Sequence, residues 1–127
     1  MKILIVEDDA SQRMFLRRVL EKYFTAEITE AKNGVEGLLM MKDHRPELAI
    51  LDIMMPLMDG HELLMRMRHS EALKDIPVII LSANKDTELI KKIAVFGVVD
   101  YLLKPLSIEQ IRSRLSKFTE QLSLSEH

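Results

Sequence analysis

The sequence predicts an α/β protein in which a parallel sheet is covered by helices on both faces. Five short apolar runs alternate with five longer helical patterns along the chain. Several of the runs are continuous and rich in β-branched residues, which is typical of strands buried on both faces. The connections between the runs are long enough for the crossovers that parallel strands require. A chain of 127 residues is the size of one domain, so we expect a single layered unit.

The first part of the chain predicts two strands and two helices. Ile3–Val6 is an uninterrupted apolar strand, whereas the more polar, alternating Glu27–Ala31 is typical of an edge strand. The first helix opens at Ser11, and the second follows Gly34 and stops before Pro46. The apolar positions that recur every three or four residues in these two helices are Phe15, Leu16, Val19, Leu20, Tyr23, Val35, Leu38 and Leu39.

The second part of the chain continues the alternation. Leu48–Leu51, Val78–Leu81 and Tyr101–Leu103 are the remaining predicted strands. The apolar residues of the three helices are Leu63, Leu64 and Met67, then Leu89, Ile90, Ile93 and Ala94, and finally Ile108, Ile111, Leu115, Phe118 and Leu122. The fourth helix is expected to end near Gly97. We therefore expect one domain over residues 1–122 and a frayed tail over residues 123–127.

Composition and charge exclude several classes of function. The 18 basic and 20 acidic residues give a net charge of −2, whereas a nucleic-acid-binding domain needs clustered positive charge. The absence of cysteine excludes a disulfide framework, a thiolate zinc site and a cysteine nucleophile. No apolar stretch approaches the roughly 18 residues of a membrane span, and the first is too short for a signal peptide. We expect a cytoplasmic protein that binds neither nucleic acid nor membranes directly.

Acidic residues follow two of the predicted strands. Glu7 and Asp8 come directly after the first strand, and Asp52 comes directly after the third. Ligands of open α/β sheets bind beyond the carboxyl ends of the strands, so these acids converge if the two strands are neighbours. Carboxylates held together repel one another unless a cation is present, and hard oxygen ligands suit Mg²⁺. Lys104 adds a positive charge after the fifth strand. The alternative interpretation is a set of separately solvated loop acids.

Other phosphate-binding or hydrolytic designs fit less well. The loop after the first strand has neither G-x-x-x-x-G-K nor G-x-G-x-x-G, and its acids would repel the phosphate of a flavin nucleotide. A haloacid-dehalogenase phosphatase would need an acid at Met54. With no Trp and only two Tyr, the chain lacks the aromatic groove expected of a glycosidase.

Four segments in this order and spacing resemble the receiver domain of two-component response regulators. They are Ile3–Asp9, Leu51–Gly60, Leu81–Ala83 and Asp100–Pro105, and the L-D-x-x-M-P-x-M-D-G block within the second is highly specific. The resemblance covers essentially the whole chain. It implies a flavodoxin-like, doubly wound (βα)5 fold with strand order 2-1-3-4-5. It also implies a signalling protein that takes a phosphoryl group from a histidine kinase or a histidine phosphotransfer protein, and that is no enzyme beyond its own phosphorylation and dephosphorylation.

The resemblance assigns roles to the acids and their neighbours. Asp52 is the expected phosphoacceptor and a Mg²⁺ ligand. Asp8 would bind the ion directly, Glu7 would act largely through water, and the backbone carbonyl of Met54 would be a further ligand. Ser82 and Lys104 are expected to complete the catalytic set.

Further roles concern switching and output. Ser82 and Tyr101 are the expected switch residues, and Pro105 is expected to follow a cis peptide bond. The signal would leave through the fourth helix, fifth strand and fifth helix to an output partner or into a homodimer. The exposed residues expected on that fourth helix are Lys91, Lys92 and Val95.

Two features bear on how well the switch works. Val98 stands where the family usually has a small Ala, which is expected to crowd the space behind the fourth helix. The resemblance implies that Met54 and Asn84 border the approach of hydrolytic water. Neither residue supplies a charged base, so we predict a long-lived phosphorylated state. A non-phosphorylated pseudo-receiver and a flavin-binding electron carrier are the alternative functions. Because no output domain follows the last helix, we expect either a stand-alone receiver or one excised from a longer protein.

Overall fold

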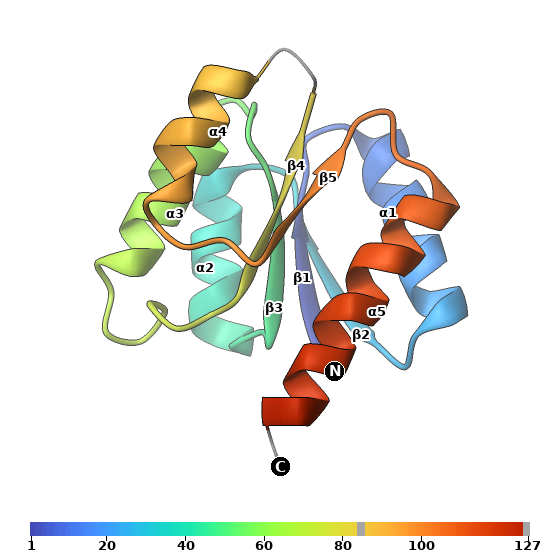
Figure 1. The fold of residues 1–127 in the computed structure, drawn as a ribbon. Helices are drawn as coiled ribbons and strands as arrows, with labels where there is room; N and C mark the ends of the chain where they lie inside the picture. The colour runs from blue at the N-terminus through green and yellow to red at the C-terminus, as the bar shows by residue number, and fades with distance from the viewer. Residues whose placement is uncertain (84–85, 126–127) are drawn as a thin grey trace.

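The computed structural model describes residues 1–83 and 86–125, with side chains as far as residue 120, and confirms the layered architecture. One parallel sheet has the strand order β2-β1-β3-β4-β5. Its strands are β1 (Lys2–Val6), β2 (Glu27–Ala31), β3 (Leu48–Asp52), β4 (Val78–Ser82) and β5 (Asp100–Leu103). The helices are α1 (Ala10–Tyr23), α2 (Gly34–His44), α3 (Gly60–Arg68), α4 (Thr87–Ala94) and α5 (Ile108–Ser125). Figure 1 shows α1 and α5 on one face of the sheet and α2, α3 and α4 on the other.

Alternate residues of each central strand face different cores. Ile3 and Ile5 of β1 pack against α1 and α5, whereas Leu4 and Val6 pack toward α2, α3 and α4. Every residue of β3 and β4 is buried, because both strands lie inside the sheet with helices above and below. Because both faces are buried, these strands appear in the sequence as continuous apolar runs. β2 is only partly buried and pairs with β1 alone, which confirms the prediction of an edge strand.

Side-chain caps fix where α1, α2 and α3 begin. The carboxylate of Asp9 accepts a hydrogen bond from the backbone N–H of Gln12 at 3.0 Å, and so starts α1. Asn33 and Asp59 start α2 and α3 in the same way. The cap at Asp9 is next to the acidic residues, because it fixes where the chain turns into α1 immediately after Asp8.

The apolar pattern of α2 describes its buried face only in part, because Leu38 packs against the core but Val35 and Leu39 do not. Val35 and Leu39 are 45% and 59% exposed, and the buried positions are Gly34, Gly37 and Met41. A Cβ atom on Gly37 would lie 3.0 Å from the Val6 side chain, so α2 approaches the sheet closely at this glycine. A pattern of apolar residues does not predict a contact that is possible only because glycine has no side chain.

The last helix differs from its predicted pattern at both ends. Ile108 is 42% exposed because it is the first residue of α5 and precedes the turn that packs on the sheet, while Ile111, Leu115 and Phe118 are buried as predicted. α5 continues to Ser125, three residues past the predicted limit at 122, and the side chain of Leu122 lies outside the described part. Within the described ranges, no helix has the length and apolar character needed to cross a membrane.

Candidate functional site

The predicted acidic site forms at the carboxyl ends of β1 and β3. The two strands are neighbours, with Val6 paired to Leu51, so Asp52 at the end of β3 lies beside the residues that follow β1. Carboxylate oxygens of Glu7, Asp8 and Asp52 all lie within 4.8 Å of one another. Glu7 and Asp52 are buried, whereas Asp8 is exposed. The interpretation as separately solvated loop acids is therefore wrong.

Lys104 reaches the two buried acids from the end of β5. Its ammonium Nζ donates a hydrogen bond to Asp52 Oδ2 at 2.9 Å and lies 3.3 Å from Glu7 Oε2. Burial on its own lowers the pKa of Lys104, but the hydrogen bond to Asp52 and the charges of both acids outweigh it and raise the pKa. The lysine is thus held charged beside Asp52.

Glu7 is the most perturbed group of the site. Burial, followed by the charge of Asp52, raises its pKa from 4.5 to about 7. Its Oε1 accepts a hydrogen bond from the Asp9 backbone at 3.1 Å. Its Oε2 is buried and accepts no hydrogen bond among the described residues, although Lys104 is near.

This donor set fits a small divalent cation. A buried carboxylate oxygen without a hydrogen bond is costly unless another ligand satisfies it. Three converging carboxylates offer the hard oxygen atoms that Mg²⁺ prefers, and none of the three residues is a nitrogen or sulfur ligand.

The loop after Asp52 holds that carboxylate in place. The backbone N–H of Met54 donates to Asp52 Oδ1 at 3.3 Å, while the Met54 side chain is 59% exposed. Gly60 packs so closely that an added Cβ would lie 2.4 Å from the Asp52 carbonyl oxygen. Leu57 adopts a left-handed backbone with φ of 68°. The M-D-G motif is the only sign in the sequence of this close approach, which leaves no room for a side chain at Gly60.

The other predicted site residues lie on β4 and β5. Ser82 is buried at the end of β4, one residue after the partner of Asp52 in the sheet. Tyr101 is half-buried on β5, where burial and then the charge of Asp100 raise its pKa. The Lys104–Pro105 peptide is cis, which confirms that prediction. Asn84 lies outside the described residues.

Arg13 is a site neighbour that the sequence analysis missed. Its Nη1 donates to the backbone carbonyl of Glu7 at 2.7 Å, and its Nε lies 3.3 Å from Glu30 on β2. The guanidinium therefore braces the backbone that carries the first two acids. In the sequence Arg13 is an ordinary polar residue of an amphipathic helix, and nothing there identifies this contact.

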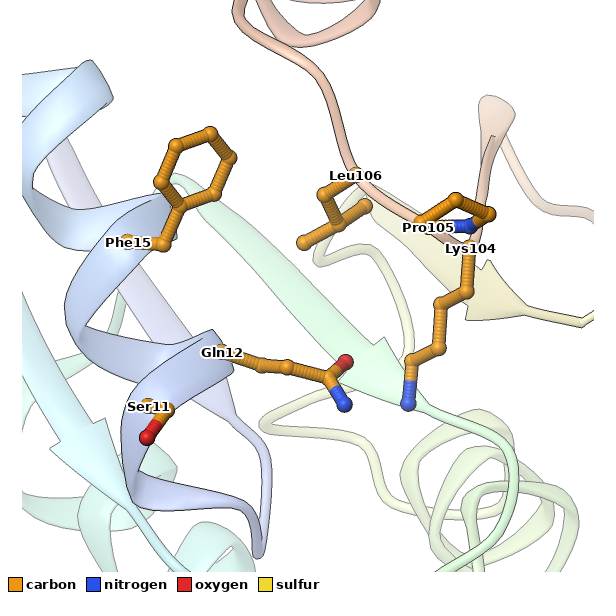
Figure 2. A pocket seen from close by; sticks show the side chains of 6 residues that line it. All are labelled: Ser11, Gln12, Phe15, Lys104, Pro105 and Leu106. Carbon is orange, nitrogen blue, oxygen red and sulfur yellow. The ribbon is translucent and has the colours of Figure 1, made fainter.

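A cavity of about 560 Å³ opens beside Lys104 between α1 and the segment after β5. Figure 2 shows the side chains of Gln12 and Lys104 reaching toward each other across it. The remaining lining residues are Ser11, Phe15, Pro105 and Leu106. Of the residues at the acidic site, Lys104 is the one that lines this cavity.

The chain matches the family described as the response regulator receiver domain over residues 3–116. It is 37% identical over 115 residues to the sensor histidine kinase TmoS of Ectopseudomonas mendocina. That match covers 91% of this chain but 12% of the kinase, so the similarity is confined to one segment of a longer protein. The chemotaxis protein CheY-3 of Vibrio cholerae is 34% identical, with 96% of this chain and 94% of that protein covered.

Among solved structures, the fold is similar to the REC domain of AraT, a response regulator from Geobacillus stearothermophilus. The TM-score is 0.85 at 28% sequence identity, covering 99% of this chain and 98% of that domain. The shared fold includes the strand order 2-1-3-4-5 on which the convergence of the acids depends.

Proposed function

The chain belongs to the response regulator receiver domain family, and on that premise we propose that Asp52 accepts a phosphoryl group from a phosphohistidine. The donor is a histidine kinase or a histidine phosphotransfer protein. The observation that carries the proposal is the buried Asp52 carboxylate, which lies beside Glu7 and Asp8 and accepts a hydrogen bond from the Lys104 ammonium at 2.9 Å. No metabolite is turned over, because the domain is itself the phosphoryl acceptor.

The reaction needs an oriented carboxylate and relief of charge repulsion. One oxygen of Asp52 attacks phosphorus, the phosphorus–nitrogen bond to the donor histidine breaks, and an acyl phosphate forms. Lys104 and the Met54 N–H hold the two carboxylate oxygens, so the attacking group is oriented before the donor arrives. The Lys104 ammonium also offsets the negative charge that the phosphoryl group brings.

Glu7, Asp8 and Asp52 would hold Mg²⁺, with the Met54 carbonyl as a further ligand. When bound, the ion neutralises negative charge on the acids and on the phosphoryl oxygens. The unsatisfied Glu7 Oε2 supports this assignment, because a cation offers that oxygen the partner it lacks. Arg13 keeps the Glu7 backbone in position for the same purpose.

The cavity beside Lys104 is the proposed approach for the donor protein. Its apolar residues Phe15, Pro105 and Leu106 offer a surface on which a partner can pack, and the Lys104 ammonium lies at the other end of the cavity, beside Gln12. A partner packed there could present a histidine to Asp52. A nucleic acid is a poor partner for this protein because its net charge is −2.

The proposed output uses a different face. A phosphoryl group on Asp52 gives the Ser82 hydroxyl a new acceptor, and Tyr101 on β5 follows that change. The surface formed by α4, β5 and α5 then carries the signal to an output partner or a second copy. Lys91, Lys92 and Val95 are exposed as predicted, and Val95 is 80% exposed.

The experiment that tests the proposal is labelling by acetyl phosphate. We expect Mg²⁺-dependent labelling of the wild-type protein, no labelling with a chelator, and none of Asp52→Asn. Asp43→Asn, which removes an exposed acid at the far end of α2, is the matched control and should label normally. Failure of the wild-type protein to label would support the non-phosphorylated pseudo-receiver instead.

A further inference from the structure

The peptide unit that joins Leu103 to Lys104 is held from both sides. Its N–H, which belongs to Lys104, donates to the Ser82 carbonyl of β4 at 2.7 Å. Its carbonyl, which belongs to Leu103, accepts from the Gln110 side-chain amide at 2.9 Å. The backbone from which the Lys104 side chain reaches Asp52 is therefore fixed by one contact within the sheet and one from α5.

Gln110 makes a second contact with Leu103. Its side-chain oxygen accepts the backbone N–H of Leu103, so the amide pairs with Leu103 as a neighbouring strand would. Leu103 lies at the sheet edge, where its outward-facing groups meet no further strand among the described residues. Gln110 thus closes the edge of β5 at the residue before Lys104.

The position of Gln110 in its helix makes these contacts informative. Ser107 Oγ accepts from the Gln110 backbone N–H at 3.2 Å, which places Ser107 at the N-cap of α5 and Gln110 at the third helical position. In a capping box, a glutamine at that position turns back to the N-cap backbone. Here its side chain forms hydrogen bonds with the backbone of Leu103 on β5, and not with the backbone at the start of α5.

We propose that Gln110 is a positioning residue for phosphoryl transfer, acting through Lys104. Gln110 does not touch Asp52. It fixes the peptide from which Lys104 extends, so that the ammonium meets the Asp52 carboxylate. The inference rests on the proposed function and deepens it: α5 belongs to the proposed output surface, so a partner that shifts α5 also shifts Lys104 and changes the rate of phosphorylation.

The test compares two substitutions that each remove a contact between α5 and β5, one at Leu103 and one at Asp100. Gln110→Met keeps the length of the side chain and removes both hydrogen bonds to Leu103. Arg114→Ala is the matched control, because Arg114 lies 3.6 Å from Asp100 and links the same two elements without touching Leu103. We expect Gln110→Met to slow labelling by acetyl phosphate about three- to ten-fold, as loss of one or two hydrogen bonds would. Arg114→Ala should label at the wild-type rate, and the Mg²⁺ midpoint should not change in either variant.

A double-mutant cycle separates positioning from a general loss of structure. If Gln110 acts through the lysine, Gln110→Met has no further effect on labelling in a Lys104→Ala background. Wild-type labelling by Gln110→Met, or an equal loss in both backgrounds, would overturn the inference while leaving the proposed function intact. A wild-type protein that does not label overturns both.

Discussion

Replacing Glu7 by Gln should stabilise the metal-free protein, and the gain should depend on pH. The substitution keeps the shape of a buried side chain and removes its charge. The Gln oxygen can still accept from the Asp9 backbone, as Glu7 Oε1 does at 3.1 Å. The new amide group can donate to the neighbouring Asp52 carboxylate, which Glu7 can do only when it is protonated.

The size of the effect follows from the pKa of Glu7, which burial and the charge of Asp52 raise from 4.5 to about 7. Below the lower value Glu7 is protonated in both the folded and the unfolded protein. As pH rises toward the higher value the unfolded chain releases the proton first, so the folded state progressively loses stability. The difference of about 2.5 pH units corresponds to about 3 kcal/mol above pH 7.

The assay is urea unfolding in the presence of a chelator at several pH values. The free energy of unfolding of Glu7→Gln should exceed that of the wild type by under about 1 kcal/mol at pH 5 and by about 3 kcal/mol at pH 8. Asp8→Asn, which removes an exposed acid of the same cluster, should gain less than about 1 kcal/mol at any pH. A difference between Glu7→Gln and wild type that stays flat from pH 5 to pH 8 would refute the reasoning.

Three further outcomes are expected. Met54→Asn should speed decay of the phosphoprotein several-fold after the donor is removed, because an amide can hold a hydrolytic water where the exposed thioether cannot; unchanged decay would contradict this. Gly60→Ala should lower the urea-unfolding free energy by more than about 2 kcal/mol, since its Cβ would lie 2.4 Å from the Asp52 carbonyl. Gly97→Ala, with open space but a φ of 73°, should cost about 1 kcal/mol, and equal losses would argue against the clash. Beryllofluoride should change hydrogen exchange around Val95 and Tyr101, and a change confined to Asp52 would rule out the proposed output face.

The sequence predicts the fold well because the central strands are buried on both sides. That burial forces continuous apolar runs such as Ile3–Val6, and the crossovers between them leave long helical patterns. The convergence of the acids follows as soon as β1 and β3 are neighbours, so Glu7, Asp8 and Asp52 could be found without coordinates. The buried face of α2 could not, because its contacts with the sheet depend on Gly37 having no side chain.

The supporting contacts of the site are less predictable. Arg13 bonds to the Glu7 carbonyl and Gln110 to both backbone groups of Leu103. A hydrogen bond from a side chain to the main chain cannot be predicted from the type of the partner residue, because nearly every residue has the same backbone N–H and C=O groups. The capping role of Asp9 cannot be predicted from the sequence for a related reason, since it depends on where the backbone turns into α1.

We propose that Asp52 is the residue that receives the phosphoryl group. The most direct measurement is to phosphorylate the protein with acetyl phosphate and Mg²⁺, reduce the acyl phosphate with borohydride, and locate the modified residue by peptide mass spectrometry. We expect reduction at position 52 alone, in the peptide that carries the L-D-x-x-M-P-x-M-D-G block. Modification of Asp8 or Asp9 in place of Asp52, or of no acidic residue at all, would contradict the account.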